Sequence, residues 1–202
     1  FAIRWFTPTA EVDLCGHATL ATAFVIFRYL EPDTQEIEFD SRSGLLSVAR
    51  KGSKMRMDFP KDLPQSLSKQ KGEIDGVIGG NTVAVMKGKD DILAILATQL
   101  EVEKIRPDFG LMSKLDCRGL IVSAVGENYD FVSRCFYPNY GVNEDPVTGS
   151  AHCLLAPYWS EVLHKKTLNA RQLSRRGGSL TCKVGENRVY LSGTCVPYMI
   201  GE

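Results

Sequence analysis

The sequence predicts an α+β protein made of two pseudo-symmetric lobes, each a β barrel wrapped around one central α-helix. Three observations support this fold class. The chain repeats a set of short motifs in the same order, and one stretch is apolar on nearly every side, as a fully enclosed helix would be. The segments that follow this stretch alternate polar and apolar residues with the period of β-strands. A chain of 202 residues can bury two small cores of this kind.

The repeat consists of three motif pairs that occur in the same order. R-W-F-T-P at 4–8 corresponds to R-C-F-Y-P at 134–138, C-G-H-A at 15–18 to T-G-S-A at 148–151, and S-R-S-G at 41–44 to S-R-R-G at 174–177. The members of the first pair lie 130 positions apart and those of the other two pairs lie 133 apart, so one loop differs by three residues. Three matches in register indicate an internal duplication.

The first copy is expected to hold the apolar central helix over 16–30, after a strand at 1–6. Short strands are predicted at 36–39, 45–50 and 55–59, with Met55, Met57 and Phe59 facing inward. A polar connection at 61–72 is the predicted boundary, so residues 1–65 form the first lobe and residues 66–202 the second.

The two copies differ in length at their front. About 60 residues precede Arg134 in the second copy, whereas three precede Arg4 in the first, so we expect the front of the first repeat to be missing from this chain. An apolar central helix cannot stay bare, because each large exposed apolar side chain forfeits roughly 1.5 to 3 kcal/mol. We therefore expect either a partner chain to cover it or the polypeptide to begin about 60 residues earlier.

The second copy is expected to contain strands at 74–78 and 82–87 around a Gly-Gly-Asn turn, and a helix at 90–100 whose apolar residues recur at helical spacing. Pro157 lies inside the predicted second central helix and indicates a kink or an early stop, because proline in a helix interior costs about 3 kcal/mol. That helix spans 149–163, and the remaining strands are expected at 119–125, 130–136, 168–174, 179–184, 188–192 and 195–200.

The composition excludes few classes of protein. Lys and Arg equal Asp and Glu at 24 each, so there is no basic excess of the kind that nucleic acid or an anionic membrane requires, and neither is expected as a partner. No apolar run reaches the roughly 18 residues of a membrane span, and no signal peptide opens the sequence. The cysteines form no C-x-x-C pair, so we expect free thiols, no metal site and a cytoplasmic location. They are Cys15, Cys117, Cys135, Cys153, Cys182 and Cys195.

The stretch at 141–152, G-V-N-E-D-P-V-T-G-S-A-H, predicts an active-site loop that leads into the second central helix. Pro146 biases Asp145 toward extended geometry and so holds its carboxylate on the loop. Thr148, Gly149 and Ser150 start the helix, whose free N–H groups suit a carboxylate or another oxyanion. The same residues are also typical of a turn and helix cap without a catalytic role.

These motifs resemble the PhzF family of phenazine biosynthesis-like proteins, which has the diaminopimelate epimerase-like fold. The likeness rests on R-W-F-T-P-T-A-E-V-D-L-C-G-H-A-T at 4–19, on the 141–152 stretch and on S-R-R-G-G at 174–178, and it covers essentially the whole chain. The resemblance implies a homodimer with an active site in the cleft between the lobes, where both central helices point their N-termini. It also implies an isomerase that needs no cofactor and moves a proton on a small carboxylic acid, the founding activity acting on a dihydro-hydroxyanthranilate.

The resemblance implies catalytic roles for His17, Asp145 and Ser150. Allylic proton transfer needs a general acid or base, which His17 could provide, while the other two would orient the substrate or relay a proton. His17 has an alternative role as a helix-start side chain that bonds a nearby carbonyl. The predicted substrate-binding residues, whose backbone would hold the substrate carboxylate, are Cys15, Gly16, Ala18, Thr148 and Gly149.

Some acids and histidines are not assigned to catalysis. The family's main proton carrier is a Glu in an N-terminal segment that this chain lacks, and Glu11 and Glu144 occupy other motif positions. Without that Glu the chain is expected to bind substrate but to convert it poorly. His152 and His164 are expected to be structural.

Two other functions stay open. A racemase or epimerase of the same fold needs a thiol ahead of each central helix, and Cys15 occupies the first such position while Thr148 occupies the second. An interaction protein that keeps the fold without catalysis is the other alternative. Convergence of His17, Asp145 and Ser150 on an open cleft favours an enzyme, and their separation favours an interaction protein.

Overall fold

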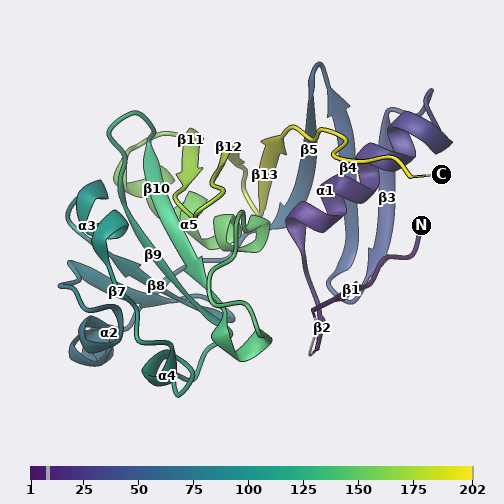
Figure 1. Cartoon of the computed structure of the whole chain (residues 1–202). Helices are drawn as coiled ribbons and strands as arrows, with labels where there is room; N and C mark the ends of the chain where they lie inside the picture. The colour runs from purple at the N-terminus through teal and green to yellow at the C-terminus, as the bar shows by residue number, and fades with distance from the viewer. Residues whose placement is uncertain (8–9, 202) are drawn as a thin grey trace.

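The computed structural model describes residues 1–7 and 10–201 and shows two halves joined by one sheet (Figure 1). Pro8 and Thr9, which belong to the first repeated motif, lie outside the described residues. The first half consists of β1 Trp5–Phe6, β2 Glu11–Val12, α1 Gly16–Val25 with a π-helical continuation Ile26–Leu30, β3 Glu36–Ser41, β4 Gly44–Lys51 and β5 Lys54–Pro60. The helix with its continuation, β3, β4 and β5 match the predicted elements within a few residues, whereas the predicted strand at 1–6 is formed only at Trp5–Phe6 and β2 was not predicted.

The second half begins with β6 Gln65–Ser66, a 3-10 turn Ser68–Gln70, α2 Lys71–Ile78, β7 Ala84–Lys87, β8 Asp91–Ile95, α3 Gln99–Lys104 and α4 Phe109–Met112. It continues with β9 Gly119–Val125, β10 Phe131–Phe136, a 3-10 turn Pro138–Tyr140, α5 Gly149–Val162, β11 Thr167–Gln172, β12 Gly178–Val184 and β13 Arg188–Gly193. Among the described helices none is both long and apolar enough to cross a membrane.

One eleven-stranded sheet runs through both halves in the order β3-β4-β5-β13-β12-β11-β10-β9-β8-β7-β6. The last strand of the chain, β13, joins the halves because it pairs antiparallel with β5, with Val189 opposite Phe59. In the second half, β8 and β9 are parallel, as are β10 and β11. The two halves therefore share backbone hydrogen bonds as well as a connecting segment.

The core lies on both faces of the sheet in the second half. In β9, Ile121 packs in the cluster that contains α5, whereas Leu120 and Val122 pack in a separate cluster with α2, α3 and α4. Both faces of these strands are covered, so their sequences are continuous apolar runs. In the first half, α1 packs against β5, and Met55, Met57 and Phe59 face inward as predicted.

Two predicted elements have a different secondary structure from the one expected. The expected strand at 74–78 belongs to α2, where Ile74, Val77 and Ile78 are buried at helical spacing and Gly79 ends the helix in the left-handed conformation. The expected helix at 90–100 is instead β8, in which every residue is buried, followed by α3. Because β8 is buried on both faces of the sheet, its residues do not alternate between polar and apolar. Their apolar spacing therefore predicted a helix.

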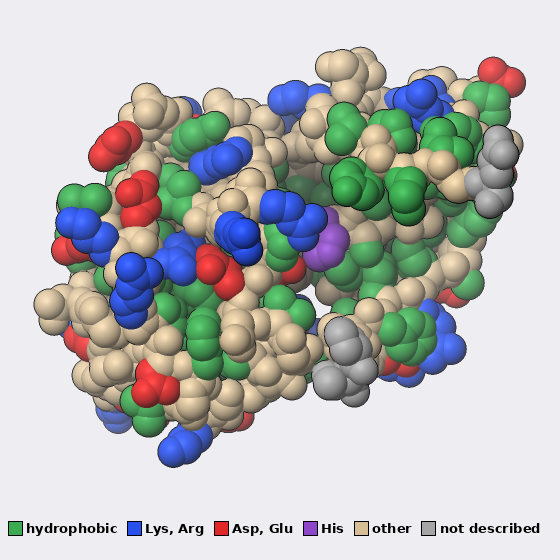
Figure 2. Space-filling model, in the orientation of Figure 1, with side chains coloured by type: hydrophobic (Ala, Val, Ile, Leu, Met, Phe, Trp, Pro, Cys, Tyr) green, Lys and Arg blue, Asp and Glu red, His purple; other side chains and the backbone are tan. Residues whose placement is uncertain are grey.

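The predicted helix at 149–163 is confirmed as α5, which continues past Pro157 to Val162, because its buried apolar side chains outweigh the one lost hydrogen bond. Of the two expected effects of Pro157, the early stop does not occur and the kink stays a prediction. The predicted strand at 195–200 is wrong, since these residues form no strand. The first central helix packs on one side against β5, while Val25 and Tyr29 are 47% and 48% exposed, so the segment or partner expected to cover this side stays a prediction. Green apolar side chains gather over this half in Figure 2.

Candidate active site

The two central helices begin against each other. A Cβ atom on Gly16 would lie 2.8 Å from the Cα of Gly149, and a Cβ on Gly149 would lie 2.9 Å from the Cα of Gly16. Real Cβ contacts are longer, so only glycine permits this approach of the two backbones. The prediction that the duplicated helix starts meet is confirmed. Two positive helix ends with unpaired N–H groups therefore lie side by side.

A cavity of about 480 Å³ opens at this meeting point, and a hollow between the two halves is visible in Figure 2. Both helix starts line it, together with apolar side chains that include Trp5, Val12 and Tyr140. Such a mixture suits a small acid with an apolar ring or chain. All eight predicted site residues line this one cavity: Cys15, Gly16, His17, Ala18, Asp145, Thr148, Gly149 and Ser150.

The duplication extends to side-chain contacts that sequence reasoning did not find. Arg4 donates to both carboxylate oxygens of Glu11 at 2.8 and 2.9 Å, and Arg134 donates to both oxygens of Glu144 at 2.7 and 3.0 Å. The two glutamates are 133 positions apart, the spacing of the helix starts. Arg134 lies in β10, so its pair connects the loop with Glu144 to the preceding strand, whereas in the first copy Arg4 lies just before β1 and Glu11 begins β2. In both copies the glutamate pairs with an arginine, which explains its presence without a catalytic role.

The S-R-S-G and S-R-R-G turns hold the same loops from the other side. Ser43 donates to the carbonyl of Asp13 at 2.8 Å, and Ser174 donates to the carbonyl of Pro146 at 2.7 Å. Both accepting residues lie three positions ahead of the first residue of a central helix. The third motif pair thus positions the loops that carry the site.

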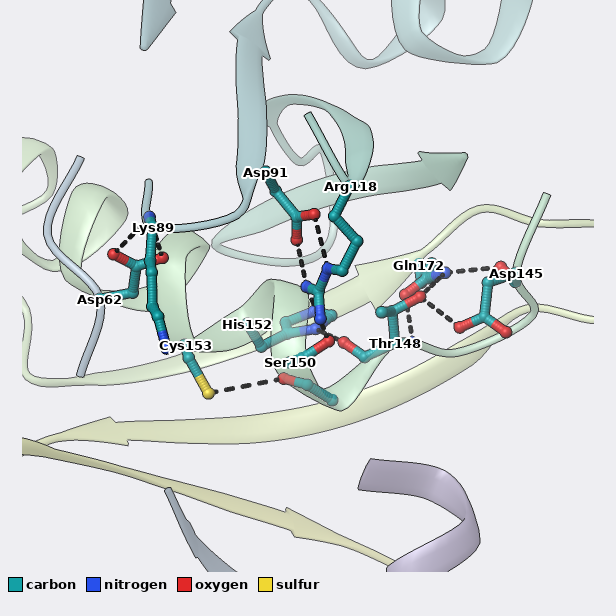
Figure 3. Close-up of polar contacts among 11 residues, drawn as sticks. Asp62, Lys89, Asp91, Arg118, Asp145, Thr148, Ser150, His152, Cys153 and Gln172 are labelled. Atoms are coloured by element: carbon teal, nitrogen blue, oxygen red, sulfur yellow. Dashed lines mark hydrogen bonds and ion pairs between the residues drawn. The ribbon is translucent and has the colours of Figure 1, made fainter. Parts of the chain in front are cut away.

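Asp145 is fixed by a network around a buried glutamine (Figure 3). Thr148 donates its hydroxyl hydrogen to the Asp145 carboxylate, and Gln172 donates to the Asp145 carbonyl at 2.7 Å and to the Thr148 hydroxyl at 3.1 Å. The Gln172 carbonyl also accepts the Thr148 N–H at 2.8 Å. The Thr148 hydroxyl therefore has its hydrogen and a lone pair engaged. Gln172 was missed, although a glutamine at an inward position of a strand is a signal that it serves a buried network.

His17 combines the two roles considered from the sequence. Its Nδ1 lies 3.0 Å from the carbonyl of Val147, which can only accept, so Nδ1 carries a hydrogen. Its Nε2 lies 3.7 Å from the sulfur of Cys15. Contact with Cys15, together with the charges of Cys15 and Asp145, outweighs partial burial and raises the pKa of His17 to about 9. The side chain is therefore a cation at neutral pH.

Arg118 is a charged residue of the cavity wall that the sequence motifs did not reveal. It donates to both oxygens of the Asp91 carboxylate and, at 3.2 Å, to the hydroxyl of Ser150 (Figure 3). Burial opposes its charge, but the hydrogen bonds and charge of Asp91 raise its pKa. Its only sequence signal is position, since Asp91 begins β8 and Arg118 precedes β9, and those strands are parallel neighbours.

His152, near the start of α5, lies away from the cavity. His152 is fully buried, donates from Nδ1 to the Thr148 carbonyl at 2.7 Å, and packs against Phe131. Burial lowers the pKa of His152 to about 4, so the ring is neutral at physiological pH. This placement agrees with the structural role expected for it.

No cysteine in the described chain forms a disulfide, so the prediction of free thiols agrees with the structure. Cys135, Cys153 and Cys182 are buried, whereas Cys15 is partly exposed at the cavity. Residues 1–7 and 10–201 contain no group of His, Cys, Asp and Glu side chains suited to hold a metal ion.

Comparison with known proteins decides the family. The sequence model of the PhzC-PhzF family, described as phenazine biosynthesis-like protein, matches residues 1–201. The chain belongs to the phenazine biosynthesis-like family. Among the relatives of this family is an uncharacterized isomerase of Pseudomonas aeruginosa, 45% identical over 201 residues, which cover 100% of this chain and 77% of the relative. A second relative, from Halalkalibacterium halodurans, is 40% identical and is also named an uncharacterized isomerase.

Solved structures confirm the predicted fold class. A PhzF-family protein of Enterococcus faecalis has a TM-score of 0.90 and 47% identity, over 96% of this chain and 74% of that one. A hydroxyproline epimerase of Agrobacterium vitis has a TM-score of 0.63 over 96% of this chain and 67% of its own, at 9% identity, which shows a shared fold alone. The phenazine biosynthesis-like chain therefore has the α+β fold of the PhzF and proline racemase-like proteins.

Proposed function

We propose that this phenazine biosynthesis-like protein is an isomerase of the PhzF type, which needs no cofactor and moves a proton on a small cyclic or unsaturated carboxylic acid bound between the two lobes. The observation that carries the proposal is the convergence of His17, Asp145 and Ser150 on one cavity at the meeting of two helix starts. The isomerase names of its relatives support the same reaction class.

Binding of the acid follows from the charges of the cavity. The N–H groups at the starts of α1 and α5 suit a carboxylate, and the cationic His17 adds a full positive charge beside them. The apolar wall with Trp5 and Tyr140 suits the ring or chain of the acid. The carboxylate would therefore lie at the helix starts and the carbon skeleton along the apolar wall.

Proton transfer requires one group that accepts a proton and one that donates it. Asp145, whose backbone and carboxylate are both held by neighbours, would accept the proton from an allylic carbon of the acid. His17, protonated at neutral pH, would supply a proton to the carbon at the other end of the allylic system. The double bond shifts between these carbons, and no atom is gained or lost.

The decisive experiment uses cyclohex-2-ene-1-carboxylate in deuterium oxide, followed by proton NMR, because its conjugated 1-ene isomer is the more stable product. In keeping with the poor conversion expected from the sequence, the expected result is slow formation of the 1-ene isomer with deuterium at the carbon that the double bond has left, and this reaction is lost in H17Q and D145N. The variant H164Q, altered in the exposed turn that follows α5, is the matched control and should exchange like the unaltered chain. A crystal soaked with the same acid should show its carboxylate at both helix starts. An acid bound elsewhere at saturation, with this cavity empty, would contradict the proposal.

A racemase of the same fold is the second candidate, favoured by the contact of Cys15 with His17. It needs a thiolate ahead of the second helix too, and Thr148 occupies that place with its hydroxyl hydrogen given to Asp145. Exchange of the α-hydrogen of L-proline that disappears in Cys15→Ala would favour this candidate over the isomerase.

A further inference from the structure

Arg118 lies outside every repeated motif, yet it is the charged side chain that meets Ser150. Its side chain is 23% exposed and that of Asp91 is 5% exposed, so the pair is largely removed from water. A largely buried cation needs an anion that bonds it, and Asp91 provides one through both of its carboxylate oxygens. The guanidinium carbon Cζ also lies over the ring of Tyr137, 5.5 Å from its centroid. Arg118 is therefore held on two sides.

The hydrogen bond from Arg118 to Ser150 sets the direction of the serine hydroxyl. A guanidinium has donors and no acceptor, so the contact at 3.2 Å must use a lone pair of the Ser150 oxygen. The single hydroxyl hydrogen then has to point to a different acceptor. In the described part of the chain, no other side chain bonds Ser150. The remaining direction for the hydrogen is the cavity that Ser150 lines.

We infer that Arg118, held by Asp91, is a positioning residue that makes Ser150 a hydrogen-bond donor to the carboxylate of the substrate. This inference rests on the proposed function, because it assigns the source of one donor in the same site. The backbone N–H groups at the helix starts and the Ser150 hydroxyl then all donate to one anion. Because an arginine stays charged throughout the accessible pH range, this donor does not switch with pH, in contrast to His17.

Titration with benzoate, followed by amide chemical shifts, tests the inference. Loss of one hydrogen bond to a charged group weakens binding by about tenfold, so S150A should raise the Kd by about that factor. Changing Arg118 alone leaves Asp91 buried and unpaired, so the informative variant is the neutral pair D91N/R118Q, with R118K as the conservative change. R188Q is the matched control, because Arg188 pairs with Asp58 between two other strands. It should lower the melting temperature and leave the Kd unchanged.

The expected result is coupling between the two sites. D91N/R118Q should weaken benzoate binding about as much as S150A, the triple variant should be no weaker than S150A, and R118K should restore part of the loss. Losses that multiply to about a hundredfold in the triple variant would show that Arg118 acts independently of Ser150, and would overturn the inference while the proposed function stands. Benzoate that shifts no resonance near the helix starts of the unaltered chain would overturn the proposed function and the inference with it.

Discussion

Replacing Gly16 by alanine tests the contact on which the candidate site depends. The added Cβ would lie 2.8 Å from the Cα of Gly149, whereas carbon atoms in contact lie about 3.5 to 4.0 Å apart. The obstacle is backbone, so no side chain can rotate away and the two helix starts must separate by roughly 0.7 to 1.2 Å. Overpacking of this kind costs about 1 to 3 kcal/mol, and the gain from removing a glycine offsets about 0.5 to 1 kcal/mol of it.

The expected net effect is a loss of about 0 to 2.5 kcal/mol in the free energy of unfolding, which for a chain of this length lowers the melting temperature by up to about 10 °C. Thermal unfolding followed by circular dichroism measures it. Gly76→Ala in α2 is the matched control, because no atom lies within 4 Å of its added Cβ, and it should stabilise by about 0.5 to 1 kcal/mol. If G16A raised the melting temperature as much as G76A, the two helix starts could not be in contact.

Three further predictions concern the cavity and its loops. The pKa of His17 is raised from 6.5 to about 9, so protonation of His17 stabilises the folded state. This stabilisation is complete below about pH 6.5, and both it and the affinity for benzoate should fall as the pH rises through about 9. Cys15→Ala removes the largest cause of that shift and should lower the His17 pKa measured by NMR. Ellman's reagent should label Cys15 first in the native state and all six thiols after denaturation, because burial raises the pKa of the Cys117 and Cys195 thiols and the other three are buried.

Each of these has a result that would contradict it. Affinity for benzoate that is flat from pH 7 to 10 in the unaltered chain would show that His17 is not the cation of the site, with H17Q as the control that should be flat. A pKa of His17 that is unchanged in C15A would remove the thiol as its cause. Fewer than six thiols after denaturation without reductant would indicate a disulfide.

The sequence was sufficient to find the candidate site because the site is built from the duplicated motifs. The helix starts at Gly16 and Gly149, and the side chains of His17, Asp145 and Ser150, lie in short contiguous stretches whose spacing is visible in the printed chain. Local chemistry decides these positions, since a helix start after an Asp-Pro turn needs no distant partner to be recognised.

The parts that could not be predicted depend on tertiary contacts. The residues of β8 have the spacing of a helix, and only the presence of helices on both faces of the sheet makes them a strand. The capping box of Thr98 and Glu101 does mark where α3 begins, and this signal was available in the sequence. Arg118 joins the site only through strand pairing, so no local pattern could place it beside Ser150.

The pairing of β5 with β13 has a consequence for the synthesis of the chain. Val189 reaches Phe59 across 130 positions, and a ribosome that adds about 5 to 20 residues per second needs roughly 7 to 26 seconds to produce them. Throughout that interval, the outer edge of β5 exposes unpaired N–H and C=O groups beside three apolar side chains. Such an edge pairs readily with a neighbouring nascent chain. The edge of β5 therefore stays unpaired until β13 has been synthesised. Slower elongation after residue 60 should increase aggregation during expression.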